Sequence, residues 1–273
     1  MTRAVTTAIQ ARRDARRYKV DPVRESEMPI LLDPLSYLLV SAGIFAGALV
    51  SGLMGFAFSA VAGAVLLHVL PPTEAVPLMM ACSILTQSVS LFALRRSVQW
   101  RGSAKLIAGG MVGVLPAIWL LYHVDAKIFR IGFGAFLVAY AAWMLLRPRS
   151  EALRAAAGRV HDAVVGFGGG LVGGLTAMPG ALPTIWCDLR GLPKEQQRGL
   201  VQPYIAAMQV FALAVMLSRN TLSTAALLDL TLVLPALAAG AVLGLVLFRR
   251  VSDVGFRSAA LGILAVSGVM LVV

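Results

Sequence analysis

Charged residues in this chain fall in short clusters separated by long uncharged runs, and this pattern restricts the possible folds more than any other feature. A soluble domain covers its surface with polar groups and typically has about 25% charged residues. Here only 14% of the 273 residues are charged, and 59% are hydrophobic. The pattern therefore excludes an ordinary soluble domain and predicts an all-α, polytopic helical membrane protein.

Six of the uncharged runs have the length of one bilayer crossing, which takes about 20 apolar residues. They comprise residues 75–94, 106–122, 131–146, 199–218, 230–248 and 258–273. The sequence thus predicts six ordinary membrane-spanning helices.

Two further runs do not fit a single straight helix. Residues 34–73 form 40 consecutive uncharged positions, which as one helix would be about 60 Å long. Residues 163–187 form 25 such positions, with seven glycines and prolines at Pro179 and Pro183. Each proline removes an amide donor and obstructs the preceding helical turn. Both runs are therefore predicted to break, and the second to be a discontinuous or re-entrant element.

The two broken runs correspond to one another. A shift of 122 residues places Gly52 on Gly174 and Leu70-Pro71 on Leu192-Pro193 without a gap. Each half then has a broken Gly-rich segment, a Leu-Pro turn and three transmembrane helices, which predicts two repeats. The predicted domains are a basic N-terminal tail at residues 1–33, a first transmembrane repeat at 34–147, a basic linker at 148–161 and a second transmembrane repeat at 162–273.

Basic side chains outnumber acidic ones, with a formal net charge of +11. In a soluble protein this excess would suggest nucleic-acid binding, but here the basic residues border the predicted spans. That is the bias of cytoplasmic loops, so no nucleic-acid partner is expected. The basic clusters lie at residues 95–105, 147–159, 190–198 and 249–257.

All four clusters share the cytoplasmic side only if the second broken run is a hairpin. A hairpin plus three crossings would make the two halves an inverted repeat and place the C-terminus outside. The same rule leaves the basic N-terminal tail outside, against its charge. Either the first broken run crosses once more than the second, or the natural start is Met28, directly before the first span.

The segment from Gly166 to Asp188 carries the strongest functional signal. Its glycines permit close helix packing, but packing does not explain the prolines. A helix break at membrane depth exposes free backbone amides and a half-helix N-terminus, both suited to holding an anion. Polar residues on neighbouring spans would complete the site, although a single such residue more often makes an interhelical hydrogen bond than binds a ligand. The candidate substrate-binding residues are Gly52, Gly55, Gln87, Thr176, Met178, Pro179, Gly180, Thr184, Gln202 and Gln209.

No catalytic or metal-binding constellation is recognisable in the sequence. His68, His123 and His161 are far apart at predicted span ends, where an interfacial role is the simpler interpretation. The three consecutive glycines at 168–170 are not followed by the Gly-Lys-Ser/Thr of a phosphate loop. We therefore expect no catalytic residues, no metal site and no cofactor.

Three stretches carry a family resemblance. Residues 46–55 read Ala-Gly-Ala-Leu-Val-Ser-Gly-Leu-Met-Gly, residues 70–75 read Leu-Pro-Pro-Thr-Glu-Ala, and residues 190–195 read Arg-Gly-Leu-Pro-Lys-Glu. Together with the broken Gly-rich helices, they resemble the sulfite exporter TauE/SafE family of membrane permeases over about residues 36–272. The chain departs from the family pattern at both breaks, where the bulkier Phe56, Phe58 and Met178 would narrow the site.

The resemblance implies export of sulfite, a sulfonate or a related organosulfur anion, without an ATPase domain. We therefore expect a multi-pass secondary transporter of the cell (inner) membrane, whose partners are the lipid bilayer and a small anionic substrate. The alternative is a non-transporting assembly partner or an integral-membrane enzyme. An enzyme would need His, Asp or Glu residues converging inside the spans.

Overall fold

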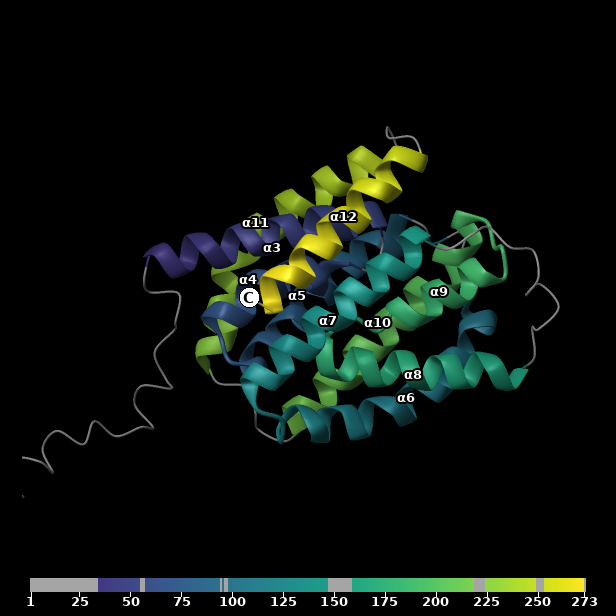
Figure 1. The fold of residues 1–273 in the computed structure, drawn as a ribbon, viewed down its shortest axis with the longest axis horizontal. Helices are drawn as coiled ribbons and strands as arrows, with labels where there is room; N and C mark the ends of the chain where they lie inside the picture. Colours follow the sequence, from purple (N-terminus) through teal and green to yellow (C-terminus); the bar gives the residue numbers. More distant parts are fainter. Residues whose placement is uncertain are drawn as a thin grey trace, which may run out of the picture.

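The computed structural model describes residues 34–54, 57–93, 95, 98–146, 159–218, 224–248 and 253–272. Across these residues every regular element is a helix, which confirms the predicted all-α fold (Figure 1). The helices are α3 (Pro34–Met54), α4 (Phe58–Val69), α5 (Pro72–Ala93), α6 (Trp100–Leu121), α7 (Ala126–Leu146), α8 (Arg159–Thr176), α9 (Ala181–Leu189), α10 (Lys194–Ser218), α11 (Thr224–Phe248) and α12 (Asp253–Val272). The predicted tail at 1–33, including Met28, and most of the predicted linker at 148–161 lie outside the described residues.

Six helices in the described part of the chain are long and apolar enough to cross a membrane. They are α3, α5, α6, α7, α10 and α11. Five of these coincide with predicted spans, and the sixth, α3, comes from the first broken run. The remaining predicted span corresponds to α12, whose apolar part at Leu261–Val272 is shorter.

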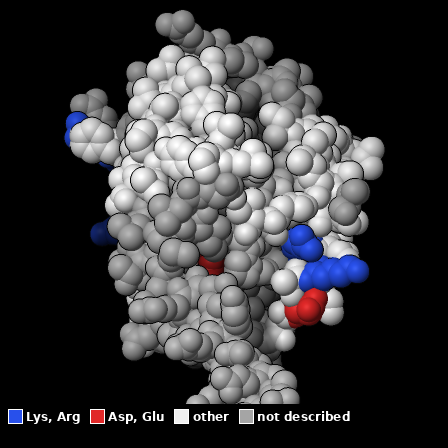
Figure 2. Space-filling model, turned by 90° about the vertical axis from the view of Figure 1, so that its left-hand side faces the viewer, with Lys and Arg blue, Asp and Glu red and all other residues white. Residues whose placement is uncertain are grey.

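The outer surface has the character expected of a lipid-facing one. Large apolar side chains point outwards, including Phe92, Trp119, Trp143 and Leu146, the last of which is 82% exposed. Figure 2 shows a face whose described residues are mostly uncharged. A soluble protein rarely exposes so many large apolar side chains together.

The first broken run folds into a hairpin. A Cβ atom on Gly43 of α3 would lie 2.9 Å from the Cβ of Val65 in α4, and one on Gly47 would lie 3.0 Å from the Cβ of Ala62. Because the contacts on α4 move back along its sequence as those on α3 advance, the two helices are antiparallel. The predicted break within residues 34–73 is thus confirmed.

The second broken run also folds back on itself. Near the break, Gly169 of α8 lies against Pro183 of α9. At the far end, the indole Nε1 of Trp186 in α9 donates a hydrogen bond of 2.8 Å to Asp162 in the first turn of α8. The hairpin predicted for residues 163–187 is therefore present.

The two short helices end at their Leu-Pro turns for identifiable reasons. Gly191 has a positive φ of 66°, its amide donates to the carbonyl of Asp188, and the amide of Leu192 donates to that of Cys187. This pair of bonds is the Schellman arrangement that terminates helices at glycine. In the first half Leu70 is extended, as expected of a residue before proline, and Pro72 starts α5.

Both halves have the same order of helices and the same pattern of packing. In each, a long helix, a break and a short helix precede three long helices. The α8 helix packs mainly against α6, and α3 packs correspondingly against α11, whereas α7 packs against α12 and α5 against α10. Glycine allows these close approaches, since a Cβ on Gly170 would overlap the backbone of Gly110 and one on Gly240 would overlap that of Phe45. The opposite membrane orientation of the two halves stays a prediction.

Candidate functional site

The two helix breaks meet inside the bundle. The hydroxyl of Ser59, in the first turn of α4, donates a hydrogen bond of 2.7 Å to the carbonyl of Ala177, directly after α8. Both residues are 1% exposed. Segments from the two halves of the chain therefore share one buried polar contact.

Ala177 supplies this acceptor through an unusual backbone conformation. Its φ of 55° lies in the left-handed region, which L-residues other than glycine rarely adopt. Its amide still donates to the carbonyl of Gly173, so the helical hydrogen bonds of α8 continue as far as Ala177. The carbonyl of Ala177 instead accepts from side chains outside α8.

A second side chain reaches the same carbonyl from α10. Nε2 of Gln209 donates to the carbonyl of Ala177 at 3.1 Å and to the hydroxyl of Ser83, in α5, at 2.8 Å. Gln209 is 2% exposed and Ser83 is also 2% exposed. The second break is therefore held by α4, α5 and α10 together.

Two half-helix N-termini begin at the breaks. The N-cap residues are Ala57 for α4 and Gly180 for α9, and neither receives a side-chain cap. The first amides of a helix have no acceptor within the helix and carry partial positive charge. Together with buried hydroxyl and carboxamide groups, such amides can hold an anion by hydrogen bonds.

Comparison with known proteins gives this arrangement a family context. The model for the sulfite exporter TauE/SafE family matches residues 39–271. The chain belongs to this family. A curated relative, the probable inner membrane transporter protein TsaS of Comamonas testosteroni, is 30% identical over 184 residues, which are 64% of this chain and 73% of the relative. No solved structure matches the chain. With its six long apolar helices, this TauE/SafE protein is a multi-pass inner membrane transporter.

Several predicted site residues of the TauE/SafE protein lie at the second break. Met178, Pro179 and Gly180 form it, and Gln209 is bound to it. Thr176 ends α8 with its hydroxyl bonded to the carbonyl of Val172, within its own helix. The fold therefore brings Gln209 to the segment that contains the other four residues.

The remaining predicted polar residues lie within α5, α9 and α10. Thr184 is buried in α9, where its carbonyl accepts from Nε2 of Gln197 at 3.2 Å. Gln87 and Gln202 are each 1% exposed, in α5 and α10. Gln87 coincides with Gln209 under the shift of 122 residues, so the two glutamines occupy equivalent positions in the two halves.

Gly52 has a packing role in the TauE/SafE protein. A Cβ at this position would lie 3.0 Å from backbone atoms of Gly244 in α11. A larger residue would therefore push α3 and α11 apart. The predicted site residue Gly55 lies outside the described residues.

Sequence reasoning did not single out two residues near the breaks and interpreted a third as a cytoplasmic anchor. Ser59 contacts the second break directly, and Ser83 does so through Gln209. The third residue is Arg198. In the structure, Nη2 of Arg198 donates to the carbonyl of Leu53, in the last turn of α3. The available signals were weak: Ser59 lies just after the first break, and Ser83 lies one turn before Gln87 in an uncharged run.

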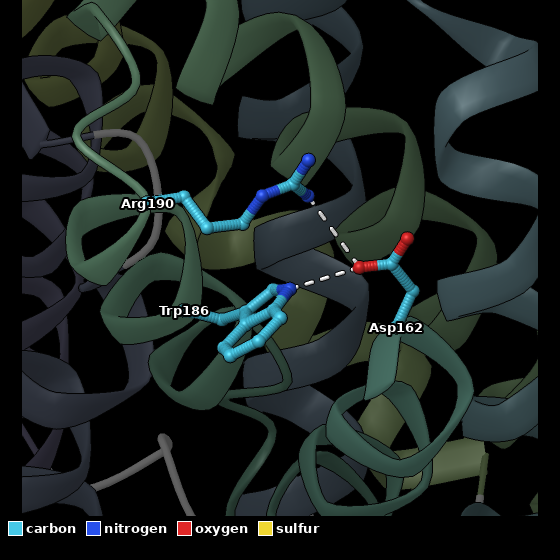
Figure 3. Close-up of polar contacts among 3 residues, drawn as sticks. All are labelled: Asp162, Trp186 and Arg190. Atoms are coloured by element: carbon cyan, nitrogen blue, oxygen red, sulfur yellow. Dashed lines mark hydrogen bonds and ion pairs between the residues drawn. The ribbon is translucent and has the colours of Figure 1, made fainter. Parts of the chain in front are cut away.

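A polar cluster closes the far end of the α8–α9 hairpin, as Figure 3 shows. Asp162 accepts a hydrogen bond from Trp186 and forms an ion pair of 3.5 Å with Arg190. His161 stacks on Trp186 with ring centroids 6.0 Å apart. These contacts hold α9 against α8 and so fix the position of the second break.

Proposed function

We propose that this TauE/SafE protein is a secondary transporter that exports a small anion, namely sulfite, a sulfonate or a related organosulfur anion, and that it is not an enzyme. The observation that carries the proposal is the hydrogen bond between Ser59 and Ala177, which joins two helix breaks inside the apolar bundle. The family's description as sulfite exporters supports the choice of substrate.

The substrate would lie where the two breaks meet. The first amides of α4 and the amide of Leu182 in α9 would donate to the anion's oxygens, which are otherwise costly to remove from water. Gln87, Thr184 and Gln202 would line the path on neighbouring helices. The halves 34–147 and 162–273, acting as inverted repeats, would expose this site to each side of the membrane in turn.

Transport into and out of proteoliposomes tests this proposal. Vesicles loaded with sulfite should release it when they contain the wild-type protein. Gly180→Leu or Pro179→Leu should abolish release, because either adds a bulky side chain at the N-terminus of α9. Gly132→Leu is a matched control, since a Cβ at Gly132 meets nothing within 4 Å. Unchanged release from both break variants would remove the site from this segment.

A further inference from the structure

The orientation of the Gln209 carboxamide at the second break is fixed by its neighbours. The Ala177 carbonyl can only accept a hydrogen bond, so the Gln209 atom 3.1 Å from it must be the NH2 nitrogen. The same nitrogen donates to the hydroxyl of Ser83 at 2.8 Å. Both hydrogens of this NH2 group are therefore used by the protein.

The carboxamide oxygen of Gln209 remains available as a hydrogen-bond acceptor. Its Oε1 is buried and has no hydrogen-bond partner among the residues that the structure describes. A carboxamide oxygen cannot bind an oxygen of a sulfonate or sulfate, because both atoms only accept hydrogen bonds. It can bind an O–H or N–H group of a substrate.

Gln202 adds a second carboxamide on the same face of α10, seven residues earlier and about 10 Å along the helix. Its side chain is 1% exposed, and within the described part of the chain neither Nε2 nor Oε1 has a hydrogen-bond partner. Buried polar groups are normally hydrogen-bonded, and leaving them unsatisfied is costly. Gln202 can therefore meet a ligand with both a donor and an acceptor.

We propose that the anion moved by this protein carries a hydrogen-bond donor as well as its oxyanion group, as in a hydroxy- or amino-substituted sulfonate. The amides at the start of α4 and α9 would bind the oxyanion, while Oε1 of Gln209 would accept from the substrate's donor. A substrate hydroxyl would also accept from Nε2 of Gln202, whereas an ammonium group would donate to Oε1 of Gln202. This inference rests on the proposed function and narrows its substrate class.

The relative affinity for two sulfonates of equal charge tests this selectivity. Isethionate and ethanesulfonate differ only in a hydroxyl group at the end remote from the sulfonate. Isothermal titration calorimetry on the full-length protein in nanodiscs should show isethionate binding about tenfold more tightly, the combined effect of the hydroxyl's hydrogen bonds to Gln209 and Gln202. In a site without acceptors the hydroxyl would have to be desolvated uncompensated, and ethanesulfonate would bind at least as well.

The Gln202→Leu variant locates the preference. It should reduce the preference for isethionate to about threefold or less, because the bond from Nε2 of Gln202 to the hydroxyl is lost and only the bond to Oε1 of Gln209 remains. Gln99→Leu, at an exposed glutamine before α6, should keep the wild-type ratio. Equal affinity of the wild type for both sulfonates, or a full preference in Gln202→Leu, would overturn the inference while leaving anion transport intact. Failure of the wild type to bind either sulfonate would also overturn the inference, and failure to release sulfite from proteoliposomes would overturn the proposed function with it.

Discussion

The hydroxyl of Ser59 and the carbonyl of Ala177 are 118 positions apart in the chain and 2.7 Å apart in the structure. Each belongs to the break of a different hairpin, so this bond couples the two halves at their least regular points. Any relative movement of the halves must alter the bond or carry both breaks together.

Replacing Ser59 with alanine removes this bond while Gln209 still donates to Ala177. We expect the free energy of unfolding to fall by about 1 kcal/mol, the usual contribution of one buried hydrogen bond, and anion efflux to fall as the breaks separate. Thermal unfolding in detergent and efflux from proteoliposomes measure the two effects.

Ser103→Ala is the matched control. It removes a hydrogen bond of 2.6 Å from a serine hydroxyl to the carbonyl of Leu200, which joins α6 to α10 and not the two breaks. A similar loss of stability with normal efflux is expected. Equal loss of efflux in both variants would contradict a specific role for Ser59.

The packing of α8 on α6 makes Gly170 intolerant of a side chain. Gly170→Ala would place a Cβ against the backbone of Gly110, which cannot move away as a flexible side chain could. Overpacking of this kind typically costs about 1–3 kcal/mol, so the unfolding temperature should drop. Gly132→Ala should show no such drop, because its Cβ would meet nothing within 4 Å.

The left-handed backbone at Ala177 predicts that replacement by glycine stabilises the protein. Ala177→Gly should raise the free energy of unfolding by up to about 1 kcal/mol, because glycine adopts this conformation without steric cost. Ala104→Gly, at an exposed interior position of α6, should instead lower it by about 1 kcal/mol. A loss of stability in both variants would contradict the strained geometry at Ala177.

The two helix breaks could be predicted from the sequence because each has a local cause. An uncharged run of 40 residues is too long for one crossing, and Pro179 lies at the second break itself. Pro183 instead lies in the first turn of α9, where its missing amide N–H costs no helical hydrogen bond. The contact between Ser59 and Ala177 could not be predicted in this way, since a serine in an apolar run carries no signal of a partner in the other half. Glycine is ambiguous for a physical reason: at Gly52 the same small size that suits a break serves the approach of α11.

The cluster at the end of the α8–α9 hairpin predicts a graded response at Asp162. Asp162→Ala leaves the Trp186 N–H without this acceptor and should cost about 1–2 kcal/mol. Asp162→Asn keeps an acceptor and loses only the partly exposed ion pair with Arg190, which contributes less. Hydrogen exchange of the α9 amides should increase strongly in the alanine variant and slightly in the asparagine variant. Equal exchange in all three proteins would show that the cluster does not hold α9.

The two hairpins predict where the chain termini lie. Each hairpin returns to the side from which it started, so each half makes three net crossings, and the basic loop at 95–105 belongs on the cytoplasmic side. Following α12 from the basic cluster at 249–257 places the C-terminus in the periplasm, and following α5 and the first hairpin backwards places residue 30 there too. Alkaline phosphatase fused at either point should be active, and the same enzyme fused within 95–105 should be inactive. A cytoplasmic C-terminus would contradict the inverted repeat, because equivalent points of the two halves would then lie on the same side of the membrane.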